Sequence, residues 1–348
     1  DYYASRGLGD VYKRQCIYRF TLNRPHNYLL TSICAFFEEY KATGEQKYLD
    51  ACKGAWDIYH NYFQNIGGGI SICEHFEVAP NSQLITNVPN SIYETCGNVF
   101  WIDLNHRLLQ LEPDNELYAS HVEQSIYNIV LACQGEDGKI RYFNHMNGIK
   151  HAPGRYNTCC EIQGTAAIGM LPQYIYMLDE EGAYVNLFAS SGIDVNVGGN
   201  AFEIKMDTNF PYSDAVYITV NAAQKGRMRL RVRMPGWMPE QTEIYLDGKK
   251  AQTGEPGSYA VFDREWEGSS VISFKLPMAM KATKYKGANT VEGKDRYALE
   301  YGPLLMAVRG PLTSEGIGDN DPTILLPMSI DELLKNLVRR GEKLEFII

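Results

Sequence analysis

The sequence has no apolar run long enough to cross a bilayer as a helix. It also has no excess of basic residues, because 42 aspartates and glutamates outnumber 33 lysines and arginines. The formal net charge is −9 and the pI is near 5.4. A protein of this charge repels phosphate backbones and anionic lipid headgroups. We therefore expect neither a nucleic acid nor a membrane as partner.

Cysteine is too sparse for a disulfide-stabilised domain. Eight cysteines are spread over 348 residues, whereas small disulfide-dependent domains concentrate theirs in a short chain. Five of them stand singly in the sequence, namely Cys16, Cys34, Cys52, Cys73 and Cys133. We expect most of these to be buried free thiols. The neighbours of Cys96, Cys159 and Cys160 instead mark them as candidate ligands.

Aromatic residues are plentiful, with 24 tyrosines and four tryptophans. Such side chains stack on sugar rings, but tyrosine is equally at home in half-buried strands. The length allows two domains, each with its own core. Composition therefore leaves carbohydrate binding and an ordinary β-rich core as alternatives.

The N-terminal segment carries a foreign signature. Residues 5–15 read SRGLGDVYKRQ, the in-frame translation of a transposase adaptor used in sequencing libraries. We therefore expect residues 1–15 to be an artefact and native sequence to begin near Cys16. The start of the gene would then be missing, so the compartment, bacterial cytoplasm or periplasm, stays open.

Residues 26–178 have the apolar spacing of helices joined by long loops. Helices are expected at 28–40, 47–63, 97–111, 116–131 and 161–178. Gly44 separates the first two, and the turn Glu112-Pro113-Asp114 separates the next two. Successive pairs of long helices suggest an (α/α)6 toroid. We predict that residues 16–180 are the C-terminal part of a toroid that is truncated at its N-terminus.

From Gly182 the apolar period becomes that of strands. Strands are expected at 184–188, 215–220, 228–234, 243–246, 271–276 and 297–308. Turn sequences such as Asp247-Gly248 separate them. Many short strands without intervening helices indicate an antiparallel β-sandwich, which we place at residues 181–348. A final helix is expected at 330–340.

Two short segments bring potential metal ligands to the starts of predicted helices. Glu94 and Cys96 lie two residues apart, so both face one way in an extended segment but not in a helix. Cys159 and Cys160 precede a predicted helix, where free N–H groups and the helix dipole favour thiolates. One carboxylate and three thiolates suit Zn²⁺. Spacing alone leaves open whether this zinc is structural or catalytic.

Several ordered blocks run through both parts of the chain. They are 93–96 (YETC), 125–128 (SIYN), 157–160 (NTCC), 173–176 (QYIY), 182–187 (GAYVNL), 234–237 (MPGW) and 301–304 (YGPL). Through them the sequence from Cys16 to about Val308 resembles the non-reducing-end β-L-arabinofuranosidases, glycoside hydrolase family 127. The resemblance implies a retaining hydrolase that releases a terminal sugar, with β-L-arabinofuranose expected. Its substrate would be a plant-type oligosaccharide or glycoconjugate, and an oligomer is compatible with it.

The resemblance also implies a set of site residues. Zn²⁺ would be held by Glu94, Cys96, Cys159 and Cys160, and Cys159 would be the nucleophile. Glu74, in the segment CEHF at 73–76, matches the general acid/base of the family.

Three histidines are expected to bind the sugar. His26, ahead of a predicted helix, falls where the family keeps a sugar-binding histidine, and His75 and His145 are further candidates. Two other functions stay open, namely a carbohydrate-binding or scaffold protein with a structural zinc, and an inactive fragment.

The chain departs from the family pattern in three places. Cys73 replaces a glycine, and extra residues between Glu74 and Glu94 leave Glu77 as a rival for the acid role. Glu161 and Ile162 stand where two prolines are expected, which alters the entry to the last helix. The loop 146–156 is short, which puts the sugar specificity in doubt.

Overall fold

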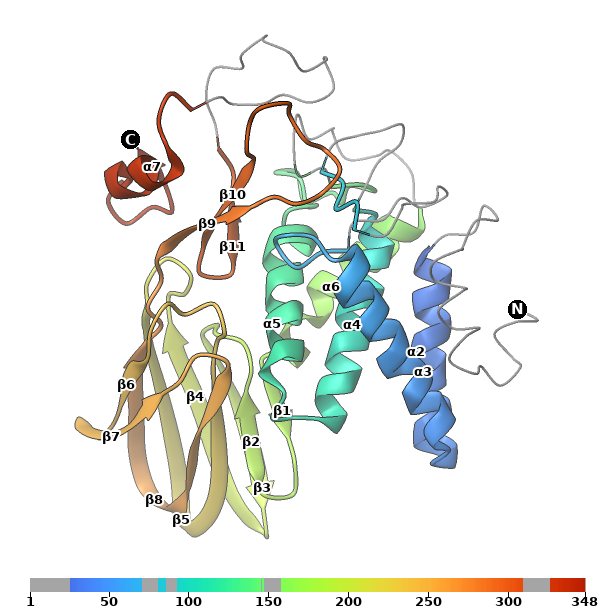
Figure 1. Ribbon diagram of the computed structural model, residues 1–348. Helices are drawn as coiled ribbons and strands as arrows, with labels where there is room; N and C mark the ends of the chain where they lie inside the picture. The colour runs from blue at the N-terminus through green and yellow to red at the C-terminus, as the bar shows by residue number, and fades with distance from the viewer. Residues whose placement is uncertain are drawn as a thin grey trace.

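The computed structural model describes residues 26–70, 81–85, 93–144, 146, 158–308 and 326–347. Residues 1–15, Glu74, His75, Glu77 and His145 lie outside this part, and His26 is described by its backbone only. A helical part is followed by a β-rich part, as predicted, and the two lie side by side (Figure 1). Within the described residues no helix is long and apolar enough to span a membrane.

Within the described residues, the helical part contains the five helices that the apolar spacing predicts. They are α2 (His26–Thr43), α3 (Gln46–Ile58), α4 (Thr95–Leu111), α5 (Glu116–Ser125) and α6 (Cys159–Met170). Helices α3 and α5 continue into π-helical turns, η1 (Tyr59–Phe63) and η2 (Ile126–Val130). Helix α6 continues into a 3₁₀ turn, η3 (Leu171–Tyr174).

The prediction of a helix to residue 178 is wrong at its C-terminal end. The α-helix stops at Met170, and Pro172 lies in the 3₁₀ turn that follows. Proline has no backbone N–H to donate to the preceding turn, so it does not continue an α-helix. The next residues form strand β1 (Tyr176–Leu178), which pairs antiparallel with β2 (Gly182–Val185).

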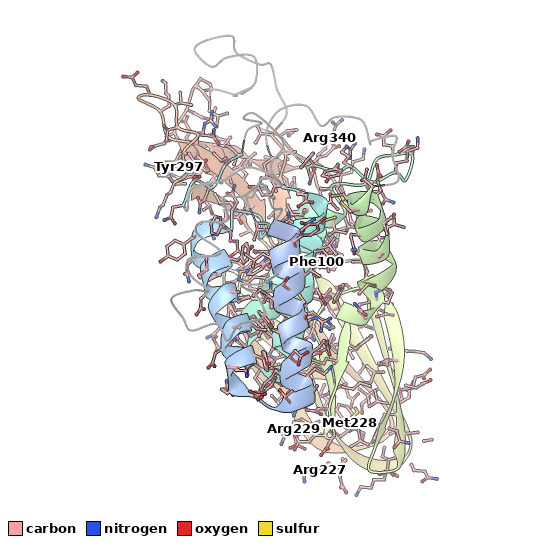
Figure 2. The ribbon with its side chains drawn as sticks, turned by 90° about the vertical axis from the view of Figure 1, so that its right-hand side faces the viewer. Phe100, Arg227, Met228, Arg229, Tyr297 and Arg340 are labelled. Carbon is pink, nitrogen blue, oxygen red and sulfur yellow. The ribbon has the colours of Figure 1, made fainter. Side chains whose placement is uncertain are left out.

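Helix α4 is central to the helical part. Its buried Trp101, Leu104 and Leu108 join a core with α2, α3 and α5, and the partly buried Phe100 packs against the same core (Figure 2). Another face of α4 packs against α5 and α6 through Ile102. Since α4 contacts both α2 and α6, it fixes the starts of these helices relative to one another.

An eight-stranded sheet forms most of the β-rich part. Besides β1 and β2 it contains β3 (Ser191–Val197), β4 (Asn200–Thr208), β5 (Ala215–Met234), β6 (Thr242–Leu246), β7 (Lys249–Gly254) and β8 (Ser258–Lys275). The strand order is β1-β2-β5-β8-β6-β7. Strand β4 pairs with the first half of β5 on one side and with β3 on the other. A register irregularity between Ala222 and Gly226 divides β5, but both halves bury alternate side chains in one core.

The prediction of a wholly antiparallel β-sandwich is wrong for one pair of strands. β2 and the second half of β5 run parallel, with Gly182 opposite Arg229. Strands β3 and β4 lie between β2 and β5 in the sequence. They carry the chain back across the sheet, so that β5 can run in the same direction as β2. The alternation of apolar residues reports which face of a strand is buried, but it does not report the direction of the neighbour.

Smaller elements follow the large sheet. They are a three-stranded sheet of β9 (Met280–Lys284), β10 (Tyr297–Tyr301) and β11 (Leu304–Met306), helix α7 (Ile330–Asn336), and the pair β12 (Val338–Arg339) and β13 (Phe346–Ile347). Helix α7 is shorter than the predicted 330–340, because residues 338–339 pair with β13 instead. Tyr297 and Arg340 lie at the opposite end of the molecule from Arg227, Met228 and Arg229 (Figure 2).

A buried ionic cluster joins the helical part to the sheet. Arg233 of β5 is fully buried, and its guanidinium donates to Glu116 Oε1 (2.6 Å) and Glu123 Oε2 (2.9 Å) of α5. Trp237 Nε1 also donates to Glu123 Oε2 (2.7 Å). The three charged residues, Arg233, Glu116 and Glu123, are called the junction cluster below.

Candidate metal centre

The start of α4 supplies two of the predicted ligands. Glu94 is the residue before the helix and has extended ψ, and Cys96 lies in the first turn. Both are buried. The segment is fixed from outside the helix, because Thr95 donates its N–H to Tyr142 O (2.9 Å) and its hydroxyl to Arg141 O (2.8 Å). The prediction that both residues precede the helix holds for Glu94 but is wrong for Cys96, because α4 begins at Thr95 rather than at Gly97.

The start of α6 supplies the other two. Cys159 and Cys160 are its first two residues, rather than lying before it as predicted. Cys160 is buried, whereas Cys159 is exposed. Glu161, one of the two departures from the family prolines, accepts the backbone N–H of Thr158 (2.5 Å). It therefore caps one of the N–H groups that a helix start leaves without an intrahelical partner.

Close packing of α6 on α4 brings the two pairs together. Gly164, one helical turn after Cys160, lies where a Cβ atom would come within 3.1 Å of Thr95 Cγ2 and 2.7 Å of Ile140 Cγ2. A side chain at this position would therefore push α6 away from α4. The glycine keeps the two helix starts in contact.

The four predicted ligands form one cluster. A carboxylate oxygen of Glu94 and the Sγ atoms of Cys96, Cys159 and Cys160 all lie within 4.8 Å of one another. Around a tetrahedral metal with bonds of about 2.0–2.3 Å, donor atoms lie roughly 3.5–4 Å apart. All six cysteines of the described residues are free thiols. The cluster can therefore hold a metal ion, and we call it the thiolate cluster.

The electrostatics of the cluster favour a cation. Burial raises the pKa of the Cys159 thiol, and nearby Cys96 raises it further. The pKa of Cys160 is raised by its hydrogen bond with Cys96, by burial and by the carboxylate of Glu94. The coulombic repulsion of Cys96 raises the pKa of both Cys159 and Cys160, because all these groups become anions when ionised. A divalent cation reverses this effect, since it favours the thiolate form of its ligands.

Two side chains that the sequence did not single out contact this cluster. Asn27, in the first turn of α2, donates from Nδ2 to Glu94 Oε1 (3.0 Å). Tyr142 places its hydroxyl 3.7 Å from Cys159 Sγ. In the sequence, only its position beside His26 at a helix start indicates that Asn27 could lie near the cluster, and this indication is weak. No spacing pattern points to Tyr142.

The structure thus brings some of the predicted site residues together and does not describe others. The backbone of His26 begins α2, and the adjacent Asn27 reaches Glu94, so the start of α2 lies at the metal centre. Glu74, His75, Glu77 and His145 lie outside the described residues, and their roles stay predictions.

These features define a class of protein: a helical part that carries a carboxylate–thiolate cluster able to hold a metal ion, joined to a β-rich part. Residues 24–170 match the model of the GH127 β-L-arabinofuranosidase catalytic domain. Residues 182–278 match the GH127 middle domain. The chain belongs to the β-L-arabinofuranosidase family GH127 of glycoside hydrolases.

Solved structures share the fold. A GH127 β-L-arabinofuranosidase from Geobacillus stearothermophilus T6 is 24% identical, with a TM-score of 0.70 over 79% of this chain and 46% of that one. A GH127 β-arabinofuranosidase is 21% identical, with a TM-score of 0.72 over 81% and 48%. A further glycoside hydrolase is 22% identical, with a TM-score of 0.68 over 81% and 52%. The chain spans about half the length of these proteins, and no curated protein matches its sequence.

Proposed function

We propose that this chain carries the catalytic centre of a retaining glycoside hydrolase that releases non-reducing-end β-L-arabinofuranose. In this proposal Glu94, Cys96, Cys159 and Cys160 bind Zn²⁺, Cys159 is the nucleophile and Glu74 is the general acid/base. The substrate is an arabinose-containing carbohydrate, with His26, His75 and His145 as sugar-binding candidates.

The main support is the unequal exposure of the four ligands. Glu94, Cys96 and Cys160 are at most 1% exposed, whereas Cys159 is exposed to solvent. A purely structural site closes around its metal with four protein ligands. Here one of the four ligand residues, Cys159, is exposed and therefore accessible to a substrate. This asymmetry favours a catalytic role over a structural zinc.

The chemistry follows the two-step retaining scheme. Bound zinc would hold Cys159 as a thiolate at neutral pH. In the first step the Cys159 sulfur bonds to the anomeric carbon, the glycosidic C–O bond breaks, and Glu74 gives its proton to the leaving oxygen. In the second step Glu74 takes a proton from water, the water oxygen bonds to the anomeric carbon, and the C–S bond breaks.

We also propose that the helical part is a segment of an (α/α)6 toroid. Its two helix pairs are similar units about 70 residues apart. Each ends in a π-helical turn followed by a short bridge, Gln64 with Ile70 and Gln134 with Ile140. Such regular repetition is what a toroid of helical hairpins requires.

The test is to trap the glycosyl group on the enzyme. Full-length Glu74→Ala protein is mixed with an aryl β-L-arabinofuranoside whose leaving group needs no protonation. The first step should proceed and the second should stall, so mass spectrometry should find a pentosyl adduct on the peptide containing Cys159. Azide should restore turnover with retained configuration. An adduct on a carboxylate, or an inverted product, would refute the mechanism.

A carbohydrate-binding or scaffold protein with a structural zinc gives a different result. Such a protein would bind the sugar equally well with or without Glu74, and it would show neither turnover nor an adduct.

A further inference from the structure

An open cavity of about 420 Å³ lies where the helical part meets the sheet. Its lining comes from the C-terminal half of α4, from η3, and from β1 and β2. The turn between α4 and α5 lies next to β1 at this place (Figure 1). His106, which lines the cavity, follows Glu94 by 12 residues along α4, a distance of about 18 Å at a rise of 1.5 Å per residue. The cavity is therefore separate from the metal centre.

Both hydrophobic cores hold one wall of this cavity in place. Met177 of β1 packs against the core of the helices, whereas the neighbouring Tyr176 packs against the core of the sheet. Neighbouring side chains of a strand point to opposite faces, so β1 is anchored on both sides. The hydroxyl of Tyr176 is also hydrogen-bonded to Ser191 Oγ (3.0 Å). The cavity is therefore preformed, as most small-molecule sites are.

The lining combines polar groups with apolar surface. His106 and Gln110 lie one turn apart on α4, so they face the same way. Tyr176, Met177 and Leu178 of β1 add apolar surface, and Leu178 is half exposed. A sugar ring has the same combination, because its hydroxyl groups lie around the edge and its C–H groups form apolar faces. The volume of about 420 Å³ also falls within the range of small-molecule sites, about 300–1,000 Å³.

His106 is suited to bind a hydroxyl group. Its ring stands edge-on to Tyr174, with the ring centroids 4.9 Å apart. Among the described residues its ring nitrogens have no hydrogen-bond partner, and burial lowers the pKa of the imidazole, so it is neutral at pH 7. A neutral imidazole offers one donor and one acceptor. A hydroxyl group, which is itself both donor and acceptor, can therefore bind to either nitrogen.

The described lining carries no uncompensated charge. The carboxylate of Asp179 pairs with Arg231 Nη1 (3.0 Å) and accepts the backbone N–H groups of Glu181 (2.9 Å) and Gly182 (2.8 Å). Burial raises the pKa of Tyr184 to about 12, so this phenol is neutral as well. A charged ligand would lose its hydration here without gaining a counter-charge, whereas a neutral ligand needs none.

We propose that this cavity binds a neutral sugar residue, as a second carbohydrate site remote from the thiolate cluster. The site goes beyond the proposed function, because it takes no part in hydrolysis and its ligand class follows from its own lining. A free monosaccharide and a residue within a glycan chain share this chemistry. The experiment below separates these two sources.

NMR of the full-length protein, labelled with carbon-13 at its methionine methyl groups, locates the binding. Met177 reports on the cavity. Met146, which packs against Tyr93 and Ile129, reports on the metal centre beside them. The probes are L-arabinose, L-arabinotriose, D-glucuronate and N-acetylglycinamide. Both neutral sugars should shift the Met177 signal; a trisaccharide that binds at least tenfold more tightly identifies a chain residue as the ligand, and equal affinities identify a free sugar.

Two substitutions in the cavity should weaken this binding. His106→Phe keeps a ring against Tyr174 but removes the nitrogens, and Gln110→Ala removes the amide. Each should raise the Kd of L-arabinose about three- to tenfold, the effect of losing one hydrogen bond between neutral groups. Gln241→Ala, which removes an exposed glutamine of the β-rich part, is the matched control and should keep the wild-type Kd. Turnover of a small aryl β-L-arabinofuranoside should be unchanged in all three variants.

Three results would overturn the inference. They are the absence of a Met177 shift with both sugars, a shift of the same size with D-glucuronate or N-acetylglycinamide, and an unchanged Kd in both His106→Phe and Gln110→Ala. Failure of the proposed function looks different, because it would leave the Met146 signal unmoved by L-arabinose while the Met177 signal still shifts.

Discussion

The junction cluster and the thiolate cluster are both buried groups of charged or ionisable residues, but they differ in how their charge is balanced. Arg233 sits between two carboxylates. Burial alone would lower its pKa, yet Glu123 and Glu116 more than offset this and raise it. In the thiolate cluster the side-chain hydrogen bond with Cys96, burial and the Glu94 carboxylate together raise the pKa of Cys160. The first cluster supplies its own counter-charges, whereas the second needs a cation to become ionised.

The difference indicates two different roles. A buried ion pair whose charges balance within the protein can hold two parts of a chain together without a ligand. A carboxylate and three thiols packed within 4.8 Å are a stable ionised set only around a metal. The following predictions test this contrast, from the largest expected effect to the smallest.

Removing the exposed sulfur should have the largest effect. Full-length Cys159→Ser should lose at least about a thousandfold in kcat/KM, because a serine hydroxyl is hardly ionised at pH 7 and is a poor substitute for a thiolate. Steady-state kinetics with an aryl β-L-arabinofuranoside measure this loss. If Cys159→Ser stays active while Glu77→Ala is inactive, the assigned nucleophile and acid are both wrong.

Breaking the junction cluster should lower stability rather than change the chemistry. Arg233→Met leaves two buried carboxylates without their counter-charge and should reduce the free energy of unfolding by about 3–5 kcal/mol. Zinc per folded chain should stay constant. Arg227→Met, which removes an exposed guanidinium of β5 that pairs with Asp263 of β8, is the control and should leave stability nearly unchanged. Denaturant unfolding measures both, and equal losses would contradict the structural role of the cluster.

Removing the metal should destabilise the protein through the thiolate cluster alone. Metal at a thousandfold excess over its Kd stabilises a folded protein by about 4 kcal/mol, which a strong chelator would remove. The chelator-dependent shift in Tm should persist in Arg233→Met and vanish in Cys96→Ala. A shift of equal size in both variants would mean that the metal binds elsewhere.

Weakening the support of Glu94 should have the smallest effect. Asn27→Ala removes the hydrogen bond to Glu94 Oε1, and the loss of such a contact to a ligand typically costs about 10- to 100-fold in metal affinity. Competition with a chromophoric chelator measures the change. Asn105→Ala, a buried asparagine away from the site, should keep the wild-type affinity, and an equal loss there would show that Asn27 has no specific role.

The sequence predicts those features that depend on local periodicity and spacing. The five helices, except for the C-terminal end of the fifth, and the meeting of Glu94, Cys96 and the cysteine pair are confirmed, whereas the first strand begins at Tyr176 rather than near residue 182. Spacing predicts that the ligands lie at the starts of two helices, but three of the four lie inside the first turns rather than before them. The roles of these residues stay predictions.

Features that depend on tertiary contact could not be predicted. Nothing in the alternation of β5 indicates that Arg233 is fully buried, because its partners lie on α5, more than 100 residues away. Asn27 and Tyr142 reach the thiolate cluster only after α2, α4 and the hairpin after η2 pack together. The parallel pairing of β2 with β5 likewise depends on the path of the chain between them.

X-ray absorption at the zinc edge of the purified full-length protein tests the central claim most directly. We expect about one zinc per chain, with three sulfur ligands near 2.3 Å and one oxygen near 2.0–2.2 Å. One sulfur should be lost in Cys159→Ala. A coordination shell made only of nitrogen and oxygen, or a spectrum unchanged in Cys159→Ala, would contradict it.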